Sequence, residues 1–417
     1  MNNTDIIALR RDLHRNAELG FVEFYTASRV LDALEDLPVS VRTGAEAMNV
    51  AEIVNYPDAE TREEWAARGI AAGGNPERIR YLRDHGSAVV AEITGNRPGP
   101  VWGLRVDMDA LPVAEAADER HLPAREGFRS VTPAMHACGH DGHVAIGVGL
   151  LHRLADHDFP GTVRILFQPA EEGVRGARPM VSAGVVEGVE RMLAVHLGHD
   201  RPTGLIVGSG VDAMATTKYV LDYRGVAAHA AASPEHGRNA LAAAATATLG
   251  LLGIPRVSSG ETRVNVGTLR ADGAANIIPA AARMTFETRG TSNAAHEEID
   301  RRAKEIVAGA ASMHGVEYEL RVTGGAPNMV PDEAMIDLVG AAAAALPGEI
   351  NFHRTITTTG SDDANIFIRA VQEAGGQGAY VQVCSGNPGP HHSEYFDVDE
   401  ASILLAVDLL ENLLRAG

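Results

Sequence analysis

Two short segments of the chain carry side chains whose types and spacing could do chemistry. The first is Met135–His143, Met-His-Ala-Cys-Gly-His-Asp-Gly-His, and the second is the adjacent pair Glu171 and Glu172. Cys138 and His140 are preferred ligands of a borderline-soft divalent metal. Of two adjacent carboxylates, one can bind metal while the other moves protons between water and a leaving group. The combination predicts metal-assisted hydrolysis.

Each segment also has a purely structural interpretation. Cys138 and His140 could be a buried thiol beside a helix-capping residue, and Glu171 and Glu172 could be a solvated acidic turn. The spacing favours metal ligands, because side chains two residues apart in an extended loop point the same way. His143 lies one turn into the expected helix and is better placed to support a ligand than to be one.

Further polar positions are candidates of the same kind. Asp107 and Asp109 follow a strand and could bind metal, fix the tautomer of a ligand histidine, or cap a turn. His196 ends an apolar strand, where a histidine is either a ligand or a satisfied core residue. The adjacent His391 and His392 lie in a loop rich in glycine and proline, which is a moderate metal signal by itself.

The alternation of strands and helices predicts how these side chains meet. Apolar runs of strand length occupy Val101–Val106, Val163–Phe167 and Met192–His196, with helical patterns such as Val144–Leu154 between them. This order predicts an α/β domain whose mostly parallel sheet is flanked by helices. Ligands of such sheets bind beyond the carboxyl ends of the strands, and the candidate carboxylates and His196 all fall at that end.

From about residue 212 the pattern becomes that of a small α+β domain with an antiparallel sheet. The expected order is strand, helix, two strands, helix and strand, after which an α/β pattern resumes at Gly324. We therefore expect a catalytic domain from 1–211 and 324–417, and an inserted domain over 212–323; a chain of 417 residues is long enough for two cores. A helical segment at about 44–91 has no role that its sequence indicates.

Composition narrows the classes of partner. The chain has 36 basic and 55 acidic residues, and a net charge of −19 disfavours nucleic acids and anionic membranes. Its 2 cysteines make no disulfide framework and suit a reducing compartment. No apolar run approaches the roughly 20 residues that span a bilayer. We expect a cytoplasmic protein that binds neither nucleic acid nor membrane.

Together these motifs resemble the dinuclear metallopeptidase and aminoacylase family, and most closely its amidohydrolase branch, which includes hippurate hydrolase and the auxin-conjugate amidohydrolases. The resemblance rests on Met135–His143, on Phe-Gln-Pro-Ala-Glu-Glu-Gly at 167–173 and on Arg-Val-Asp-Met-Asp-Ala-Leu-Pro at 105–112. It extends from Leu9 to about Leu414, which is almost the whole chain.

The resemblance implies a role for each candidate. Two divalent ions, zinc or manganese, would be held by Cys138, His140, Glu172, His196 and His392. Glu171 would act as general base and then as general acid, while Asp141 and His143 would support the ligands. The wider family has His-x-Asp where this chain has Arg105-Val-Asp107, so one histidine ligand is absent and Asp107 is expected to support the site. The amidohydrolase branch shares this change.

The resemblance also implies a substrate and partners. His229, by its sequence alone either a surface histidine or a transition-state contact, would reach a partner subunit's site and hold the oxyanion from a lid and dimerisation domain. Asn276 and Arg289 would bind the substrate's carboxylate, and Gly360 and Ser361 would lie beside its backbone.

The implied reaction is cleavage of N-acyl or N-aroyl amino acids, of the p-aminobenzoyl-glutamate or indoleacetyl-aspartate type, to an acid and a free amino acid. The alternatives are a dipeptidase or deacetylase of the same family, or a subunit that acts only with a paralogous partner. We expect a homodimer or such a heteromer.

Overall fold

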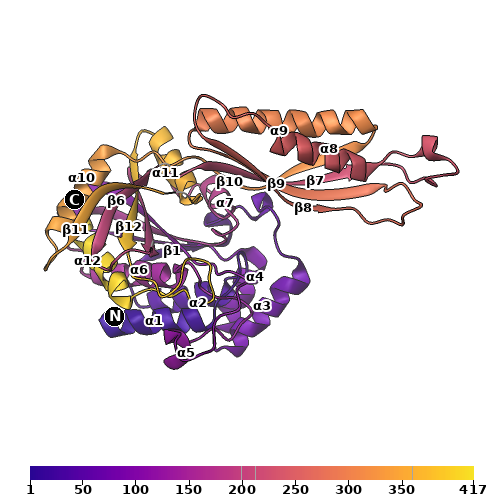
Figure 1. Cartoon of the computed structure of the whole chain (residues 1–417). Coiled ribbons are helices and arrows are strands. Elements are labelled where there is room, and N and C mark those ends of the chain that lie inside the picture. The colour runs from indigo at the N-terminus through magenta and orange to yellow at the C-terminus, as the bar shows by residue number, and fades with distance from the viewer. Residues whose placement is uncertain (199, 212, 359) are drawn as a thin grey trace. The chain divides into compact units, whose positions relative to one another are not determined.

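The computed structural model of the chain forms two compact units (Figure 1). The residues that it describes are 1–198, 200–211, 213–358 and 360–417. The first unit consists of Met1–Val211, Val330–Thr358 and Asp362–Gly417. The second consists of Asp212–Met329 with Thr359–Ser361, so it interrupts the first in the sequence.

Within the described residues, the first unit has an 8-stranded sheet in the order β1-β2-β4-β3-β5-β12-β6-β11. The strands are β1 (Ser40–Thr43), β2 (Val89–Thr94), β3 (Arg97–Asp107), β4 (Pro160–Gln168), β5 (Arg191–Gly198), β6 (Leu205–Val211), β11 (Asn351–Thr357) and β12 (Gln377–Cys384). The pairs β4–β3, β3–β5, β5–β12 and β6–β11 are parallel, and the remaining pairs are antiparallel. The predicted mostly parallel sheet is therefore confirmed.

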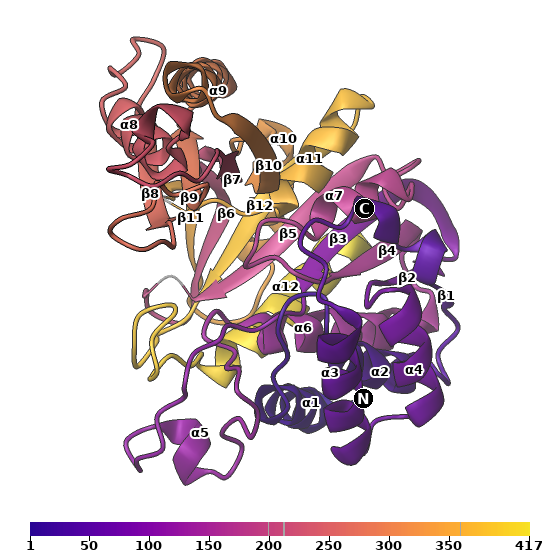
Figure 2. The same cartoon turned by 90° about the vertical axis from the view of Figure 1, so that its right-hand side faces the viewer.

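Helices cover both faces of this sheet (Figure 2). They are α1 (Asn3–Arg15), α2 (Phe24–Leu34), α3 (Ala59–Ala71), α4 (Pro76–His85), α5 (Leu122–Arg125), α6 (His140–Arg153), α7 (Ala177–Ser182), α10 (Glu333–Ala344), α11 (Ala364–Glu373) and α12 (Glu400–Ala416). Helix α6 packs against α1, α12 and β3, and its residues from His140 to Leu151 are buried on every side. An all-round buried helix has little freedom to move, so the residue that begins it is firmly placed. Of the helices in the described ranges, none is both long and apolar enough to cross a membrane.

Three neighbouring strands bring the candidate side chains to one edge of the sheet. Strands β4, β3 and β5 lie side by side and run parallel, so their carboxyl ends share that edge. Asp107 is the last residue of β3, Glu171 follows shortly after the end of β4, and His196 lies near the end of β5. Alternate residues of the same strands, such as Val106 and Phe167, enter the core against α6.

The second unit is a 4-stranded antiparallel sheet with two helices on one face, among the residues described (Figure 1). In chain order its elements are β7 (Ala215–Arg224), α8 (Ala240–Leu252), β8 (Thr262–Arg270), β9 (Ala281–Gly290), α9 (Asn293–His314) and β10 (Glu317–Ala326). Tyr219, Leu221 and Tyr223 of β7 pack against the alanines of α8, whose small side chains let the helix approach the sheet. This is the predicted α+β order.

Three features of the fold differ from the sequence-based expectation. Strands β6 and β11 were not predicted, because β6 alternates with glycine and β11 is an exposed edge strand. The second unit extends to Met329, whereas the sequence analysis ends the inserted domain at 323. The two glycines do not end the domain, because Gly324 and Gly325 continue β10 and pair with β7. A Cβ atom on residue 325 would lie 2.8 Å from the carbonyl oxygen of Thr216, so only glycine fits there beside β7.

Candidate metal centre

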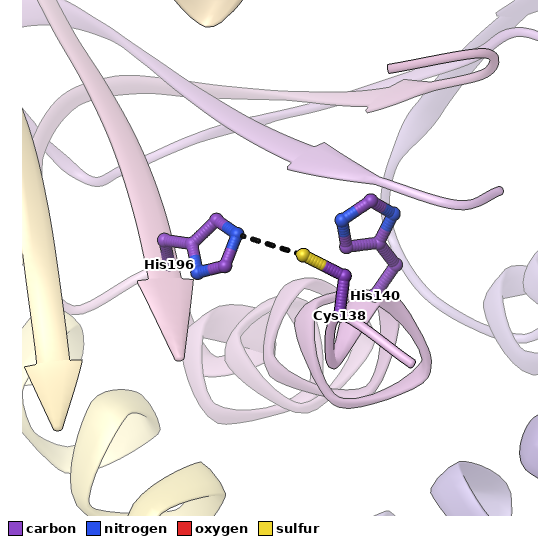
Figure 3. A group of neighbouring side chains, drawn as sticks. All are labelled: Cys138, His140 and His196. Atoms are coloured by element: carbon purple, nitrogen blue, oxygen red, sulfur yellow. Dashed lines mark hydrogen bonds between the residues drawn. The ribbon is translucent and has the colours of Figure 1, made fainter. Parts of the chain in front are cut away.

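Cys138 and His140 meet because of the glycine between them. Gly139 has φ +90° and caps the start of α6, so the chain turns there and is not the extended loop that the sequence analysis assumed. The turn still directs both side chains to one place. The Sγ atom of Cys138 and ring nitrogens of His140 and His196 lie within 4.8 Å of one another, and Figure 3 shows the three side chains converging from the start of α6 and from β5.

Hydrogen bonds orient both histidine rings of this group. The Nδ1 atom of His140 donates to the carbonyl oxygen of Asp109 at 2.8 Å, and Nδ1 of His196 donates to that of Leu197 at 2.6 Å. In each ring Nε2 is therefore left as the electron-pair donor. Nε2 of His196 lies 3.6 Å from Sγ of Cys138, and two ligands of one tetrahedral zinc ion are roughly 3.5 Å apart.

Glu172 faces a second group of possible ligands. Its Oε2 atom lies 3.5 Å from Nε2 of His392, and its Oε1 atom lies 4.0 Å from Nε2 of His140. Ligand atoms of Cys138, Glu172 and His392 also fall within 4.8 Å of one another. Cys138 thus belongs to both groups, which is the position of a bridging ligand.

Glu171 also approaches His140, with its Oε2 atom 3.9 Å from Nε2 of that ring, but its other neighbours differ from those of Glu172. The carboxylate of Glu171 lies within 4.8 Å of those of Asp362 and Asp363. Burial and the carboxylate of Asp362 raise the pKa of Glu171 well above its usual range, and burial raises the pKa of Glu172 to about 7. A carboxylate with a raised pKa is a stronger proton acceptor near neutral pH. The adjacent glutamates therefore differ in surroundings, as different roles would need.

His143 and Asp107 support the cluster from behind. Nδ1 of His143 donates to Asp107, and its Nε2 accepts from the main-chain N–H of Leu197 at 2.8 Å, so both ring nitrogens are occupied. Asp107 is fully buried, and its Oδ2 atom lies 3.6 Å from Nε2 of His140. Burial raises the pKa of Asp107, but the buried guanidinium of Arg105 and the imidazole of His140 outweigh it and the net direction is downward.

Arg105, at the position where the wider family has a histidine, is a fully buried cation. Its guanidinium pairs with Asp107, donates to Oε1 of Gln168 at 2.6 Å and donates to Oδ1 of Asp362 at 2.9 Å. The hydroxyl of Tyr380 donates to the other oxygen of Asp362 at 2.7 Å. No local sequence pattern relates Asp362 or Tyr380 to β3, so neither was predicted as a site residue.

Asp141 lies outside the ligand cluster and anchors α6. Its Oδ2 atom accepts from Nδ1 of His14 at 2.7 Å and forms an ion pair with Nε of Arg10 at 2.9 Å. Arg10 also pairs with Asp397 in the loop that follows His392. A buried network from α1 therefore ties the start of α6 to the carboxyl-terminal loop, so the two loops that carry candidate ligands share one support.

The structure brings His391 to the cluster as well as the predicted His392. Nδ1 of His391 lies 3.4 Å from Sγ of Cys138, and its ring packs against Phe396 at 4.6 Å between centroids. His392 has φ +66° and a side chain that is 55% exposed. The sequence feature that points to His391 is the adjacent pair of histidines, and the resemblance implies a metal-binding role only for His392.

The donor set fits divalent metal ions. Thiol, imidazole and carboxylate together suit zinc or manganese. Burial raises the pKa of the Cys138 thiol, so a thiolate there needs a nearby cation. Among the residues that the structure describes, Nε2 of His140 and Oε1 of Glu172 are buried atoms without a hydrogen-bond partner. Such atoms are costly unless something binds them, and a metal ion would.

In the second unit, His229 and Asn276 lie together. His229 is exposed, and its Nδ1 atom accepts from the main-chain N–H groups of Ala231 at 3.2 Å and Ala232 at 3.1 Å. The ring proton is therefore on Nε2, so this N–H can donate to a ligand. The main-chain N–H of Ala230 donates to the carbonyl oxygen of Asn276 at 2.9 Å, joining the two loops.

Arg289 and Ser361 form another pair in the second unit. Nη1 of Arg289 contacts Oγ of Ser361 at 3.4 Å, and Gly360 beside it is exposed. Nε and Nη2 of Arg289 are already paired with the carboxylate of Glu287, at 2.9 and 3.1 Å. An incoming carboxylate would therefore bind at Nη1 or displace Glu287.

An α/β fold that gathers thiol, imidazole and paired carboxylates at one edge of its sheet has the groups that metal-assisted hydrolysis needs. Comparison with known proteins agrees. The family model described as peptidase family M20/M25/M40 matches residues 103–416. The chain belongs to this family and is an amidohydrolase or peptidase, so the predicted family is confirmed.

Two curated relatives cover nearly the whole chain. The A subunit of the p-aminobenzoyl-glutamate hydrolase of Escherichia coli (strain K12) is 42% identical over 96% of this chain and 93% of its own length. The indole-3-acetyl-aspartic acid hydrolase of Enterobacter agglomerans is 40% identical over 96% of this chain and 93% of its own length. Within the amidohydrolase branch, similarity to the first of these relatives is what the segment at 44–91, Met214–Lys218, Arg263–Gly267 and the pair His391 and His392 predict, and the match confirms it.

Solved structures share the fold. The aminobenzoyl-glutamate utilization protein of Klebsiella pneumoniae has a TM-score of 0.85 and 37% identity, covering 99% of this chain and 95% of that one. A dinuclear metal binding peptidase of the M20 family from Bacillus subtilis has a TM-score of 0.70 and 25% identity, and the match covers 99% of this chain and 98% of that one. The predicted fold class, a mostly parallel α/β sheet with an inserted α+β domain that has an antiparallel sheet, is confirmed by these matches.

Proposed function

We propose that this chain is a metal-dependent amidohydrolase that cleaves N-acyl or N-aroyl amino acids into an acid and a free amino acid. Amides of the p-aminobenzoyl-glutamate and indole-3-acetyl-aspartate type are the proposed substrates, because the names of the two relatives state them. The observation that carries the proposal is that Cys138, His140 and His196 lie together in the buried interior beside two glutamates, of which only Glu172 also approaches His392.

The proposed cofactor is a pair of divalent ions, zinc or manganese. The residues that would hold them are Cys138, His140, Glu172, His196 and His392. The presence of Cys138 in both ligand groups supports a bridging role, and the Bacillus subtilis structure is described as dinuclear. When bound, such ions acidify water and polarise a carbonyl group.

The proposed proton carrier is Glu171. Its carboxylate accepts a proton from the attacking water and donates it to the nitrogen of the leaving amine as the C–N bond breaks. The raised pKa of Glu171 supports this role, because a carboxyl that holds its proton near neutral pH can return it. Asp107, Asp141 and His143 keep the ligands and α6 in place, through the hydrogen bonds described above.

Residues of the second unit are proposed to bind the substrate. The Nε2–H of His229 donates to the carbonyl oxygen as negative charge develops on it. Arg289 and Asn276 bind the carboxylate of the amino acid half, and Gly360 and Ser361 lie beside the substrate backbone. A cation at Arg289 explains how a chain of net charge −19 holds an anion.

The second unit is also proposed as a lid and dimerisation domain, the remainder being the catalytic domain. We propose a homodimer, in which His229 acts in the neighbouring protomer, or a heteromer with a paralogous chain, which is supported because the Escherichia coli relative is named as one subunit of its hydrolase. Light scattering after gel filtration of the purified chain distinguishes these: an active homodimer excludes an obligatory paralogue. A cytoplasmic location is proposed because Cys138 and Cys384 are both free.

The test is mass-spectrometric detection of products from p-aminobenzoyl-glutamate, indoleacetyl-aspartate, hippurate, simple dipeptides and N-acetyl amino acids. The purified chain is stripped of metal and reloaded separately with zinc and manganese. Metal-dependent release of glutamate or aspartate is the expected result. Cleavage only of dipeptides or acetyl amino acids replaces the proposal by a dipeptidase or deacetylase. Silence of the metal-loaded dimer on every substrate contradicts an active homodimer and leaves the heteromer.

A further inference from the structure

Glu171 and Glu172 are adjacent and both approach Nε2 of His140, at 3.9 and 4.0 Å, yet their other neighbours differ. Glu172 faces His392 and Cys138, whereas Glu171 faces Asp362. Which neighbours each carboxylate meets depends on the conformation of the main chain between the two residues. That main chain belongs to the segment between β4 and α7, residues 169–176, which we call the glutamate loop.

Asp109 contacts the main chain of both glutamates. Its Oδ1 atom accepts from the N–H of Glu171 at 2.8 Å, and its Oδ2 atom accepts from the N–H of Glu172 at 3.1 Å. The residue is 2% exposed, so water does not compete for these bonds. The carbonyl oxygen of Asp109 also accepts from Nδ1 of His140 at 2.8 Å. One residue therefore touches the proposed proton carrier and two proposed metal ligands.

We propose that Asp109 is the positioning residue that gives the two glutamates their different roles. Two successive N–H groups aimed at one carboxylate restrict the torsions of Glu171, and the side chains of Glu171 and Glu172 then leave the main chain in different directions. Charge-assisted hydrogen bonds of this kind are about twice as strong as neutral ones. The assignment of the two roles rests on the proposed function, whereas the contacts of Asp109 do not.

Two other buried carboxylates hold the flanks of the glutamate loop. Oε1 of Glu23 accepts from the N–H of Ala170 at 2.9 Å, and Ala170 has φ +55°, a conformation that a non-glycine residue keeps only when it is held. Oδ2 of Asp363 accepts from the N–H groups of Gly176 at 2.9 Å and Ala177 at 3.0 Å. Glu23 and Asp363 are both fully buried. The loop is thus fixed before, at and after the glutamate pair.

The segment at 44–91, whose role the sequence did not indicate, braces the same loop. Its Ser87 donates from Oγ to Oε2 of Glu23 at 2.7 Å. Nη1 of Arg175 in the glutamate loop donates to the carbonyl oxygen of Asn55 at 2.9 Å. Asn55 and Ser87 of this segment therefore contact the glutamate loop and the carboxylate that holds its start. Asp109 holds the loop at the glutamate pair itself.

The test replaces Asp109 by asparagine in the full-length chain. Asp109→Asn keeps the shape but turns one acceptor into an NH2 group, which faces a main-chain N–H and cannot accept from it. The matched control is Asp58→Asn, because Asp58 also accepts a main-chain N–H, from Thr61 at 2.8 Å, at the exposed start of α3. Binding of Co²⁺ alone is measured by calorimetry and by its visible absorption spectrum.

We expect Asp109→Asn to weaken Co²⁺ binding by about 10- to 100-fold and to change the Co²⁺ spectrum, while Asp58→Asn changes neither. On a cleaved substrate, kcat falls and KM stays near its wild-type value. A purely structural role would lower the unfolding temperature and leave the affinity and spectrum for Co²⁺ unchanged. A folded Asp109→Asn protein with wild-type Co²⁺ affinity and spectrum overturns the proposal.

If Asp109→Asn does not fold, Asp109→Glu takes its place. It keeps the charge and both acceptor oxygens but moves them by one methylene, so the same losses in Co²⁺ binding are expected. Wild-type Co²⁺ affinity and spectrum in Asp109→Glu would overturn the proposal. The Co²⁺ measurements need no substrate, so a wild-type chain that cleaves nothing contradicts the proposed active homodimer without deciding the role of Asp109.

Discussion

The two units hold their candidate residues in contrasting ways. In the first unit, Cys138, His140 and His143 are buried, and the two histidines lie against the buried carboxylate of Asp107. In the second unit, His229 and Asn276 are exposed, and the hydrogen bonds described for their loops involve main-chain groups. The first arrangement is preorganised for bond breaking, and the second leaves donors accessible to a ligand.

The contrast has an energetic side. Buried charge networks such as Arg10 with Asp141 cost desolvation, and removing one partner typically destabilises a protein by about 3–5 kcal/mol. Exposed contacts such as those of His229 contribute little to stability. Substitutions in the second unit should therefore change activity with small effects on folding, whereas many in the first unit change both.

The largest expected effect separates the two glutamates. Glu171→Gln should lower kcat by about 100- to 10,000-fold and leave the metal content unchanged, because it removes the proton carrier. Glu172→Gln should instead lose metal. Metal content is measured by plasma mass spectrometry beside kcat, with the exposed Glu60→Gln as control. Loss of metal in Glu171→Gln and its retention in Glu172→Gln would reverse the two roles.

The next effect belongs to the second unit. His229→Ala should lower kcat by about 100- to 1,000-fold, the amount that one oxyanion donor contributes. Metal content and unfolding temperature should stay at wild-type values, since His229 is exposed. His236→Ala, at another exposed histidine of the same unit, is the matched control. Turnover close to that of the control would exclude His229 from the reaction.

A pH measurement tests the buried network of the first unit. His14 places Nδ1 on Asp141 and Nε2 on Glu115, at 2.7 and 2.9 Å. Burial and Arg10 lower the pKa of His14, but these carboxylates outweigh them and raise it to about 9. Because the pKa of His14 in the folded protein lies above the unfolded value of about 6.5, protonation of His14 stabilises the folded protein. This stabilisation is complete below about pH 6.5 and is lost as the pH rises toward 9.

The metal-free chain should therefore lose about 3 kcal/mol of unfolding free energy from this group between pH 6.5 and 9. Urea unfolding at pH 6 and pH 9 measures it. His14→Gln should flatten the dependence, whereas the exposed His353→Gln on β11 should not. Equal pH dependence in wild type and His14→Gln would show that His14 is uncharged in the folded protein.

The smallest expected effect distinguishes the adjacent histidines. His391→Ala should weaken metal binding by about 10- to 100-fold, as the loss of a supporting contact does, and His392→Ala should weaken it more. Calorimetric titration with zinc measures both, with His353→Ala as control. Retention of metal by His392→Ala and loss by His391→Ala would make His391 the ligand, consistent with its 3.4 Å contact to Cys138.

Much of the ligand cluster could be predicted from the sequence, and its supports could not. Asp107, the glutamate pair and His196 each follow or end an apolar strand, and adjacent parallel strands bring such positions to one edge. The contact of Glu23 with Ala170, in contrast, joins distant residues by tertiary packing alone. The position of His391 likewise depends on how its loop folds back on Cys138.

The central claim is that the first unit alone assembles a two-metal site in which Glu172 is a ligand and Glu171 is not. Anomalous X-ray diffraction from crystals of the zinc-loaded chain tests it most directly. The account predicts two zinc peaks roughly 3.5–4 Å apart, with Cys138 between them and Glu172 bound. A single peak, or two peaks with Glu171 as ligand and Glu172 turned away, would contradict it.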